Sequence, residues 1–228
     1  TTGLKTFDTD GFSVTTDGSI NGTNTSSSTY VSWNWLAGGS APTQTYTVKV
    51  VSDSGNKYRF DDFGTSAVTL DLQEGGTYTF DVSDSSMNSH PFVIGTAANG
   101  TEYSTGVTYK LDGVTKTYSQ YTSGFSAATS RQLIITVAAS APALYYWCSV
   151  HSGMGGAINT NATTGSSNFD GAGQSLVHAN ATSGCSIVKY SGTGSSQTIG
   201  HGLGAAPDMM WIRRTDGTED WAVYHSGH

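Results

Sequence analysis

The chain of 228 residues carries a formal net charge of −7, and its ten lysines and arginines do not cluster, which argues against a nucleic-acid partner. Only 12% of the residues are charged, and 29 glycines and 12 tyrosines stand among many serines and threonines, a composition typical of short β-strands and polar turns. No run of about 18 apolar residues predicts a membrane span, and the chain opens without a charged and then apolar leader, so we expect a processed product or an excerpt. Because no long stretch has helical spacing, we predict a nearly all-β protein.

Residues 1–40 predict an N-terminal β-segment in which short apolar patches alternate with polar turns. Phe7–Val14 is typical of a turn that enters a strand. Thr29–Leu36 alternates with period two, which places its two tryptophans on one face of a strand, where they are more typical of a core than of a ligand platform. The small residues of Ala37–Pro42 indicate a linker to the next region.

Residues 41–160 predict a separate domain with seven strand candidates. Seven short strands joined by turns suit a Greek-key β-sandwich. The candidates are Thr45–Val51, Tyr58–Phe60, Ala67–Leu72, Tyr78–Val82, Phe92–Ile94, Gln132–Val137 and Leu144–Trp147.

A second linker and a C-terminal β-segment are predicted after this domain. Residues 161–173, within the Thr, Asn, Ser and Gly stretch Asn159–Gly173, have almost no apolar side chains and indicate the linker. Residues 174–228 then contain a glycine-rich loop that no helix follows, so a phosphate-binding loop is rejected. The strands expected in this segment are Gly184–Tyr190, Met209–Arg214 and Trp221–His225.

The most informative motif is the loop after Leu144–Trp147, where Cys148, His151 and Met154 are spaced three residues apart. A thiolate, an imidazole and a thioether at the end of a strand are the donors of a trigonal copper site with a weak axial methionine. Such a site needs a second histidine, and His90 is the only one before Cys148, 58 residues upstream. The sequence therefore predicts a copper site formed by His90, Cys148, His151 and Met154.

Three alternatives compete with the copper site. Zinc is less suited, because structural zinc prefers four strong ligands, commonly with two or more thiolates. The three motif residues could instead be a small buried thiol, a turn histidine and a core methionine. A disulfide between Cys148 and Cys185 would abolish the metal site. A second metal site among His178, His201, His225 and His228 is disfavoured, because these histidines are scattered over turns and strand ends.

The motif carries a resemblance to a known family. Residues 44–158 resemble a cupredoxin, the blue-copper fold, and the Cys-x₂-His-x₂-Met spacing is most similar to that of the amicyanins. The segment Phe80–Phe92, which contains His90, resembles the strand and loop of the family's first ligand. The resemblance implies a type 1 copper site with the ligands His90, Cys148, His151 and Met154.

The flanking segments carry a second resemblance. Ser186–Gly194, Gly200–Pro207 and Asp220–His225 resemble the opening half of a β-domain found in tail-fibre and other virion structural proteins of marine bacteriophages, and Phe7–Gly39 is similar to its closing half. This resemblance implies a location in a virion or outside the cell. It implies other copies of the chain or adjoining fibre subunits as partners, and leaves contact with a host surface open.

Two function classes follow. The first is a structural β-module protein of a viral particle or extracellular fibre that carries the copper domain, and the second is a blue-copper electron-transfer protein. An enzyme is not expected, since no Ser-His-Asp order, paired carboxylates or second metal cluster stands out in the sequence. The two incomplete flanking segments favour the structural class, because a diffusing electron carrier gains little from them.

Overall fold

The computed structural model describes residues 4–8, 11–14, 27, 29 and 41–227, and it divides the chain into two compact units, residues 1–36 and 37–228. In the first unit, β1 (Leu4–Asp8) and β2 (Gly11–Val14) form an antiparallel hairpin in which Phe7 pairs with Phe12. The predicted strand Thr29–Leu36 lies outside the described residues, apart from Thr29.

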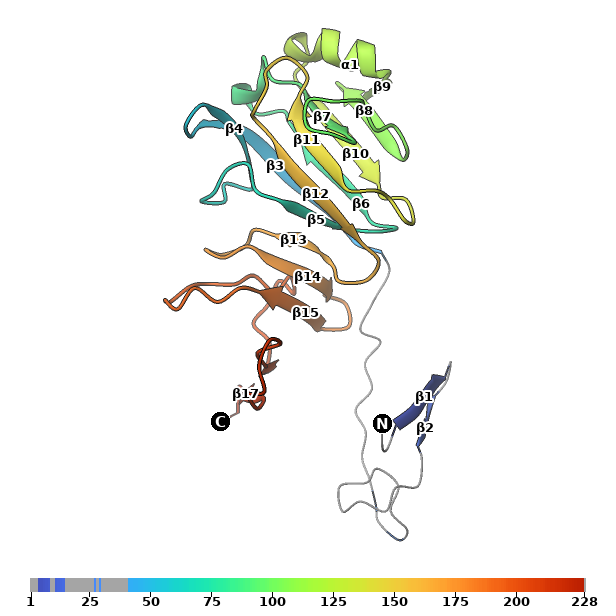
Figure 1. Ribbon diagram of the computed structural model, residues 1–228, viewed down its shortest axis with the longest axis vertical. Helices are drawn as coiled ribbons and strands as arrows, with labels where there is room; N and C mark the ends of the chain where they lie inside the picture. Colours follow the sequence, from blue (N-terminus) through green and yellow to red (C-terminus); the bar gives the residue numbers. More distant parts are fainter. Residues whose placement is uncertain (1–3, 9–10, 15–26, 28, 30–40, 228) are drawn as a thin grey trace. The chain divides into compact units, whose positions relative to one another are not determined.

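Two sheets that pack face to face form the larger part of the second unit, which confirms the predicted all-β, sandwich-type class (Figure 1). The first sheet has six strands in the order β4-β3-β6-β10-β8-β9, and the second has four in the order β5-β12-β11-β7. The first comprises β4 (Asn56–Phe60), β3 (Thr43–Ser52), β6 (Thr77–Asp81), β10 (Arg131–Thr136), β8 (Val107–Leu111) and β9 (Val114–Lys116). The second comprises β5 (Leu70–Gln73), β12 (Gly156–Asn161), β11 (Leu144–Cys148) and β7 (Phe92–Gly95).

The core between these sheets is built largely from aromatic rings. Buried and partly buried residues alternate along β4 and β6, because successive side chains of a strand point to opposite faces. Phe60 of the first sheet packs edge-to-face on Phe92 and Tyr146 of the second, with ring centroids 6.2 Å and 5.1 Å apart. This contact joins the two layers close to the ends of β7 and β11.

All seven strand candidates of the central region are present, with bounds shifted by a few residues. The sequence missed β8, β9 and β12, and β12 has the weakest strand composition of the three, since it reads Gly-Ala-Ile-Asn-Thr-Asn. It also missed the helix α1 (Tyr118–Gly124), which a capping box begins: the Thr117 side chain accepts from the Gln120 N–H, and the Gln120 side chain accepts from the Thr117 N–H. The spacing Thr-x-x-Gln is a readable start signal for this helix.

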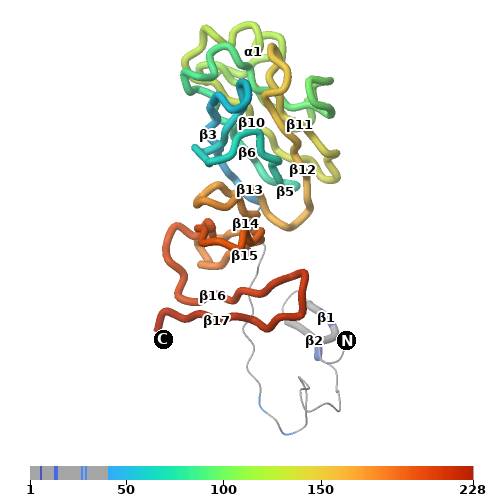
Figure 2. Tube along the Cα trace, turned by 60° about the vertical axis from the view of Figure 1, so that its left-hand side comes forward, coloured from blue at the N-terminus to red at the C-terminus, as the bar shows by residue number. Residues whose placement is uncertain are grey.

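The segment predicted as the second linker is not an open linker. Its residues Ser166–Asn168 form β13, which pairs with β14 (Ser175–Asn180), and β14 pairs with β15 (Cys185–Tyr190) in a three-stranded sheet (Figure 2). The carbonyl of Ser167 accepts a 2.7 Å hydrogen bond from the buried hydroxyl of Tyr46, and the Ser167 hydroxyl accepts one from the Asp71 N–H. The polar side chains and backbone of this segment form hydrogen bonds with polar groups of the sandwich. The segment is therefore buried although it contains few apolar residues.

The C-terminal strands β16 (Met209–Ile212) and β17 (Ala222–His225) form an antiparallel hairpin, as predicted. Every residue of both strands is exposed. Among the described residues, the chain has no helix with the length and apolarity that crossing a bilayer requires.

Candidate metal centre

Strand register brings His90 to Cys148 across 58 residues of sequence. Strands β7 and β11 are antiparallel neighbours in which Phe92 pairs with Cys148. The pairing continues beyond the strands, because the Ser149 N–H donates to the Pro91 carbonyl at 3.1 Å. The segment that carries His90 therefore runs directly beside the loop that follows Cys148.

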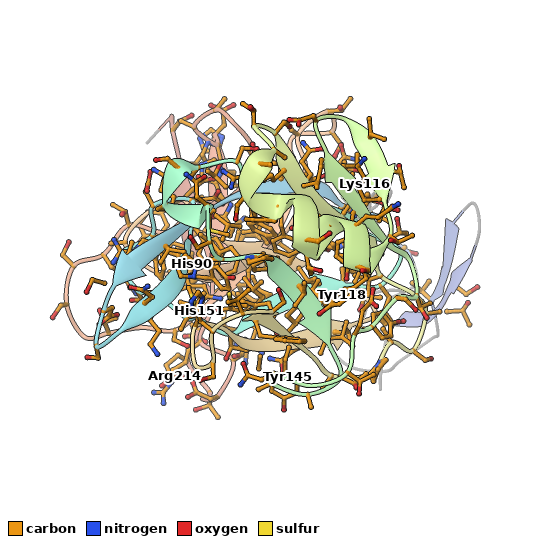
Figure 3. The ribbon with its side chains drawn as sticks, turned by 90° about the horizontal axis from the view of Figure 1, so that it is seen from above. His90, Lys116, Tyr118, Tyr145, His151 and Arg214 are labelled. Carbon is orange, nitrogen blue, oxygen red and sulfur yellow. The ribbon has the colours of Figure 1, made fainter. Side chains whose placement is uncertain are left out.

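Three of the four predicted ligands converge at this point. The Cys148 Sγ lies 3.9 Å from His90 Nδ1 and 3.6 Å from His151 Nδ1, and the ligand atoms of these residues all lie within 4.8 Å of one another. The centroids of the two imidazole rings lie 4.7 Å apart. Figure 3 labels both residues close to each other in the view from above. Cys148 is buried, His90 is partly buried and His151 is exposed, so the cluster opens to solvent on the His151 side.

The loop from Cys148 to β12 is shaped by glycine. Gly153 has a φ of +72°, a conformation that side chains rarely adopt. A Cβ on Gly155 would lie 1.7 Å from the Tyr146 carbonyl oxygen, so only glycine allows the loop to pass this close to β11. Between them Met154, the fourth predicted ligand, is 2% exposed. The loop is thus a tight return that keeps Met154 inside the sandwich.

The opposite sheet supports this loop through its edge strand β4. The Tyr58 N–H donates to the Met154 carbonyl at 3.0 Å, and the Lys57 ammonium donates to the Gly153 carbonyl. The Tyr58 hydroxyl donates to the His90 carbonyl at 3.0 Å. Neither Lys57 nor Tyr58 was predicted as a site residue, since a lysine and a tyrosine in a short strand carry no sequence signal of this role.

Burial and neighbouring groups shift the pKa values around the cluster. Partial burial, together with the neighbouring His151, lowers the pKa of His90 below its usual value. Burial, followed by the charge and hydrogen bonding of Cys148, raises the pKa of Tyr58 well above its ordinary range. The shift of the His90 pKa favours the neutral imidazole, the form in which its nitrogen can bind a metal, and the shift of the Tyr58 pKa favours the protonated hydroxyl, which donates a hydrogen bond.

The donor set and its spacing fit a thiolate-imidazole metal site. Bonds of about 2.3 Å to sulfur and about 2.0 Å to nitrogen that meet at about 120° separate sulfur and nitrogen by about 3.7 Å. The observed separations of 3.6 Å and 3.9 Å lie on either side of this value. One thiolate with two imidazoles matches the copper donor set better than the four strong donors of structural zinc, and the described residues add no carboxylate to the cluster.

The competing disulfide is not formed, because Cys148 and Cys185 are both free. Cys185 lies at the start of β15, in a different sheet from Cys148, and is partly exposed. The glycine-rich loop before β16 is followed by a strand and not by a helix, which agrees with the rejection of a phosphate loop.

Comparison with known proteins gives one match. A model of a family described as a domain of unknown function, DUF7483, matches residues 154–228. The match begins at Met154, in the loop of the metal cluster, and includes β12 as well as the sheet β13-β14-β15 and the hairpin β16-β17. No curated protein and no solved structure matches the chain.

Proposed function

We propose that this chain is a structural β-module protein of a bacteriophage particle or extracellular fibre, and that its central sandwich is a cupredoxin-like domain with a type 1 copper site. The observation that carries the copper site is the convergence of the His90, Cys148 and His151 ligand atoms within 4.8 Å. These residues come from two chain segments, far apart in sequence, that the pairing of β7 with β11 brings together.

His90, Cys148 and His151 would hold the copper, and the thioether of Met154 would be a weaker fourth donor. Bound copper supplies one-electron redox chemistry in such a site. Cys148 must lose its proton to become a ligand, and its burial limits the access of water and oxidants to the sulfur. His151 is exposed, so copper from solution would reach the cluster from the side of this imidazole, while the Cys148 thiolate stays buried.

Absorption and electron paramagnetic resonance spectra of the purified chain after addition of Cu(II) test the copper site. We expect an intense blue charge-transfer band, because the thiolate sulfur of Cys148 donates the electron density that the band reports. Cys148→Ser should remove the band, while the matched control Cys185→Ser should retain it. A colourless wild-type protein that binds no stoichiometric copper would contradict the site.

The structural role is supported by the flanking β-elements. The hairpin β16-β17 exposes apolar side chains on both faces: Met209 is 49% and Val223 57% exposed on one face, and Met210 is 44% and Tyr224 57% exposed on the other. A two-stranded hairpin is marginally stable alone, and apolar surface with open strand edges requires cover. We propose that residues 1–40 of another copy or of adjoining sequence supply this cover, in a head-to-tail contact that builds a filament.

Deletion of residues 1–40 tests the assembly. The central sandwich should remain folded, because its strands and core lie within residues 43–169, whereas oligomers or fibres should be lost. Light scattering and electron microscopy of the two chains at matched concentration measure the difference. A truncated chain that assembles like the full chain would exclude the head-to-tail contact.

Electron transfer is the second candidate function, and the exposed edge of the cluster favours it. His151 is exposed, and the neighbouring Val150 is 65% exposed, so a ligand imidazole and an apolar side chain share one surface. Such an edge suits brief docking of a redox partner. Reversible voltammetry of the copper-loaded chain, with fast electron exchange that Val150→Asp slows, is the expected result if this function operates.

A further inference from the structure

The edge strand β4 contacts the ligand segments of the candidate metal centre from the opposite sheet. Tyr58 uses two donors: its hydroxyl donates to the His90 carbonyl at 3.0 Å, and its backbone N–H donates to the Met154 carbonyl at 3.0 Å. Lys57 adds a third donor, because its ammonium donates to the Gly153 carbonyl. We call these contacts of Lys57 and Tyr58 the β4 brace.

The position of the Tyr58 hydroxyl is determined by packing. The Tyr58 side chain is completely buried, and its ring packs edge-to-face on Phe92 at 5.2 Å and tilted on Tyr146 at 6.3 Å. Phe92 pairs with Cys148, so the ring that orients Tyr58 belongs to the strand pair that carries the cluster. A ring confined in this way cannot swing its hydroxyl away from His90 without opening the core.

The backbone of Tyr58 is restrained as well. Its carbonyl accepts a 2.8 Å hydrogen bond from the Ala67 N–H, and its residue pairs with Val50 of β3. The brace is therefore a rigid part of the first sheet. The segments that it contacts are a short connection before β7 and the loop between β11 and β12, neither of which is a strand.

We propose that Tyr58, with Lys57, is the positioning residue of the metal centre, and that it sets the spacing between the His90 segment and the Cys148–Met154 loop before any metal binds. This inference rests on the proposed copper site. Without the brace, the two segments would be joined by the Ser149–Pro91 hydrogen bond and by the β7–β11 ladder alone. Groups that orient metal ligands commonly affect affinity by about 10-fold to 100-fold.

The test separates this role from that of an ordinary core tyrosine. Tyr58→Phe keeps the ring and removes only the hydroxyl. Tyr46→Phe is the matched control, since Tyr46 is also completely buried and its hydroxyl donates to a backbone carbonyl, that of Ser167, at 2.7 Å. Lys57→Met is a second variant that weakens the brace without altering the core.

For the full chain loaded with Cu(II), we expect Tyr58→Phe to release copper to a chelator about 10-fold to 100-fold faster than wild type and to change the shape of the charge-transfer band. Lys57→Met should also release copper faster than wild type, by a smaller factor than Tyr58→Phe. Tyr46→Phe should lose comparable thermal stability and keep wild-type release and spectrum. Without copper, the Ser149 amide should exchange hydrogen faster in Tyr58→Phe than in Tyr46→Phe.

The outcomes distinguish the two proposals. A wild-type chain without a blue band overturns the copper site and the positioning role with it. A blue wild type whose Tyr58→Phe and Lys57→Met variants match the Tyr46→Phe control in release rate, spectrum and Ser149 exchange overturns the positioning role alone. If Tyr58→Phe does not fold, the same measurements on Lys57→Met decide whether the brace positions the ligands.

Discussion

Strands β11 and β16 are both composed of apolar and aromatic residues but have opposite environments. Leu144–Cys148 reads Leu-Tyr-Tyr-Trp-Cys, and Met209–Ile212 reads Met-Met-Trp-Ile. In β11 all residues but Tyr145 are buried, because β12 and β7 flank the strand and the six-stranded sheet covers its inner face. In β16 every residue is exposed, and β17 is its only sheet neighbour among the described residues.

The comparison shows that an apolar strand is stabilised by burial, but that its own sequence does not determine which elements bury it. The free energy gained is about 25 cal/mol for each Å² of apolar surface removed from water, and it is gained only where other elements supply the second surface. The β11 region has that surface within residues 43–169, so it can support a rigid site at the end of the strand. Among the described residues, the β16-β17 region has no such surface, since every residue of both strands is exposed.

Alkaline pH should unfold the β11 region as a whole. Burial is the main cause that raises the pKa values of Tyr58, Tyr121 and Tyr146 above their ordinary value near 10. The unfolded chain therefore loses these protons first, so the stability they contribute is complete below about pH 10 and falls as the pH rises above it. Circular dichroism and tyrosinate absorbance should change together. Early ionisation of the buried tyrosines in a folded protein would contradict their burial.

Phe60→Ala should reduce the stability of the sandwich by about 3–5 kcal/mol, because it leaves a cavity where the aromatic rings of both sheets meet. Phe60 is fully buried and packs within 6.2 Å of Phe92 and Tyr146. Denaturant unfolding measures the change, and the copper site should weaken with it. A cost below about 1 kcal/mol would show that the two sheets do not depend on this contact.

Copper should stabilise the β11 region and leave the β16-β17 region unaffected. A ligand that binds only the folded state adds about 4 kcal/mol when its concentration exceeds Kd a thousandfold. Scanning calorimetry with and without copper should show a higher melting temperature for the sandwich. Equal melting temperatures in a protein that retains the ligand cluster would indicate a vestigial site.

Substitution in the hairpin should have the smallest effect on the stability of the single chain. Trp221→Ser and Val223→Ser should each change the unfolding free energy by no more than about 0.5 kcal/mol, since both side chains are 57% exposed. Self-association should fall in the same variants, as sedimentation would show. A large loss of stability in a dilute monomer would mean that other parts of the same chain already bury the side chains of the hairpin.

Much of the sandwich, and the residues of the candidate metal cluster, could be found from local pattern. The strand candidates of the central region were found because their residues are apolar or β-branched and are bounded by turns. Cys148, His151 and Met154 were found because they stand three residues apart in a short loop directly after an apolar strand. Local pattern missed β8, β9, the helix α1 and β12, of which β12 is polar. It also missed the buried segment Ser166–Asn168, whose side chains and backbone are satisfied by Gln44, Tyr46 and Asp71.

The sequence by itself determined the all-β class, the spacing of the three proposed ligand residues in the loop and the presence of one upstream histidine. Only the tertiary structure decided that His90 reaches Cys148, because that proximity depends on the pairing of Phe92 with Cys148 across 58 residues. It also decided that Tyr58 contacts both ligand segments, and that β11 is buried while β16 is exposed. Strand register and the order of strands in a sheet depend on the summed burial and hydrogen bonding of the whole sandwich. They therefore cannot be read from any short stretch of the sequence.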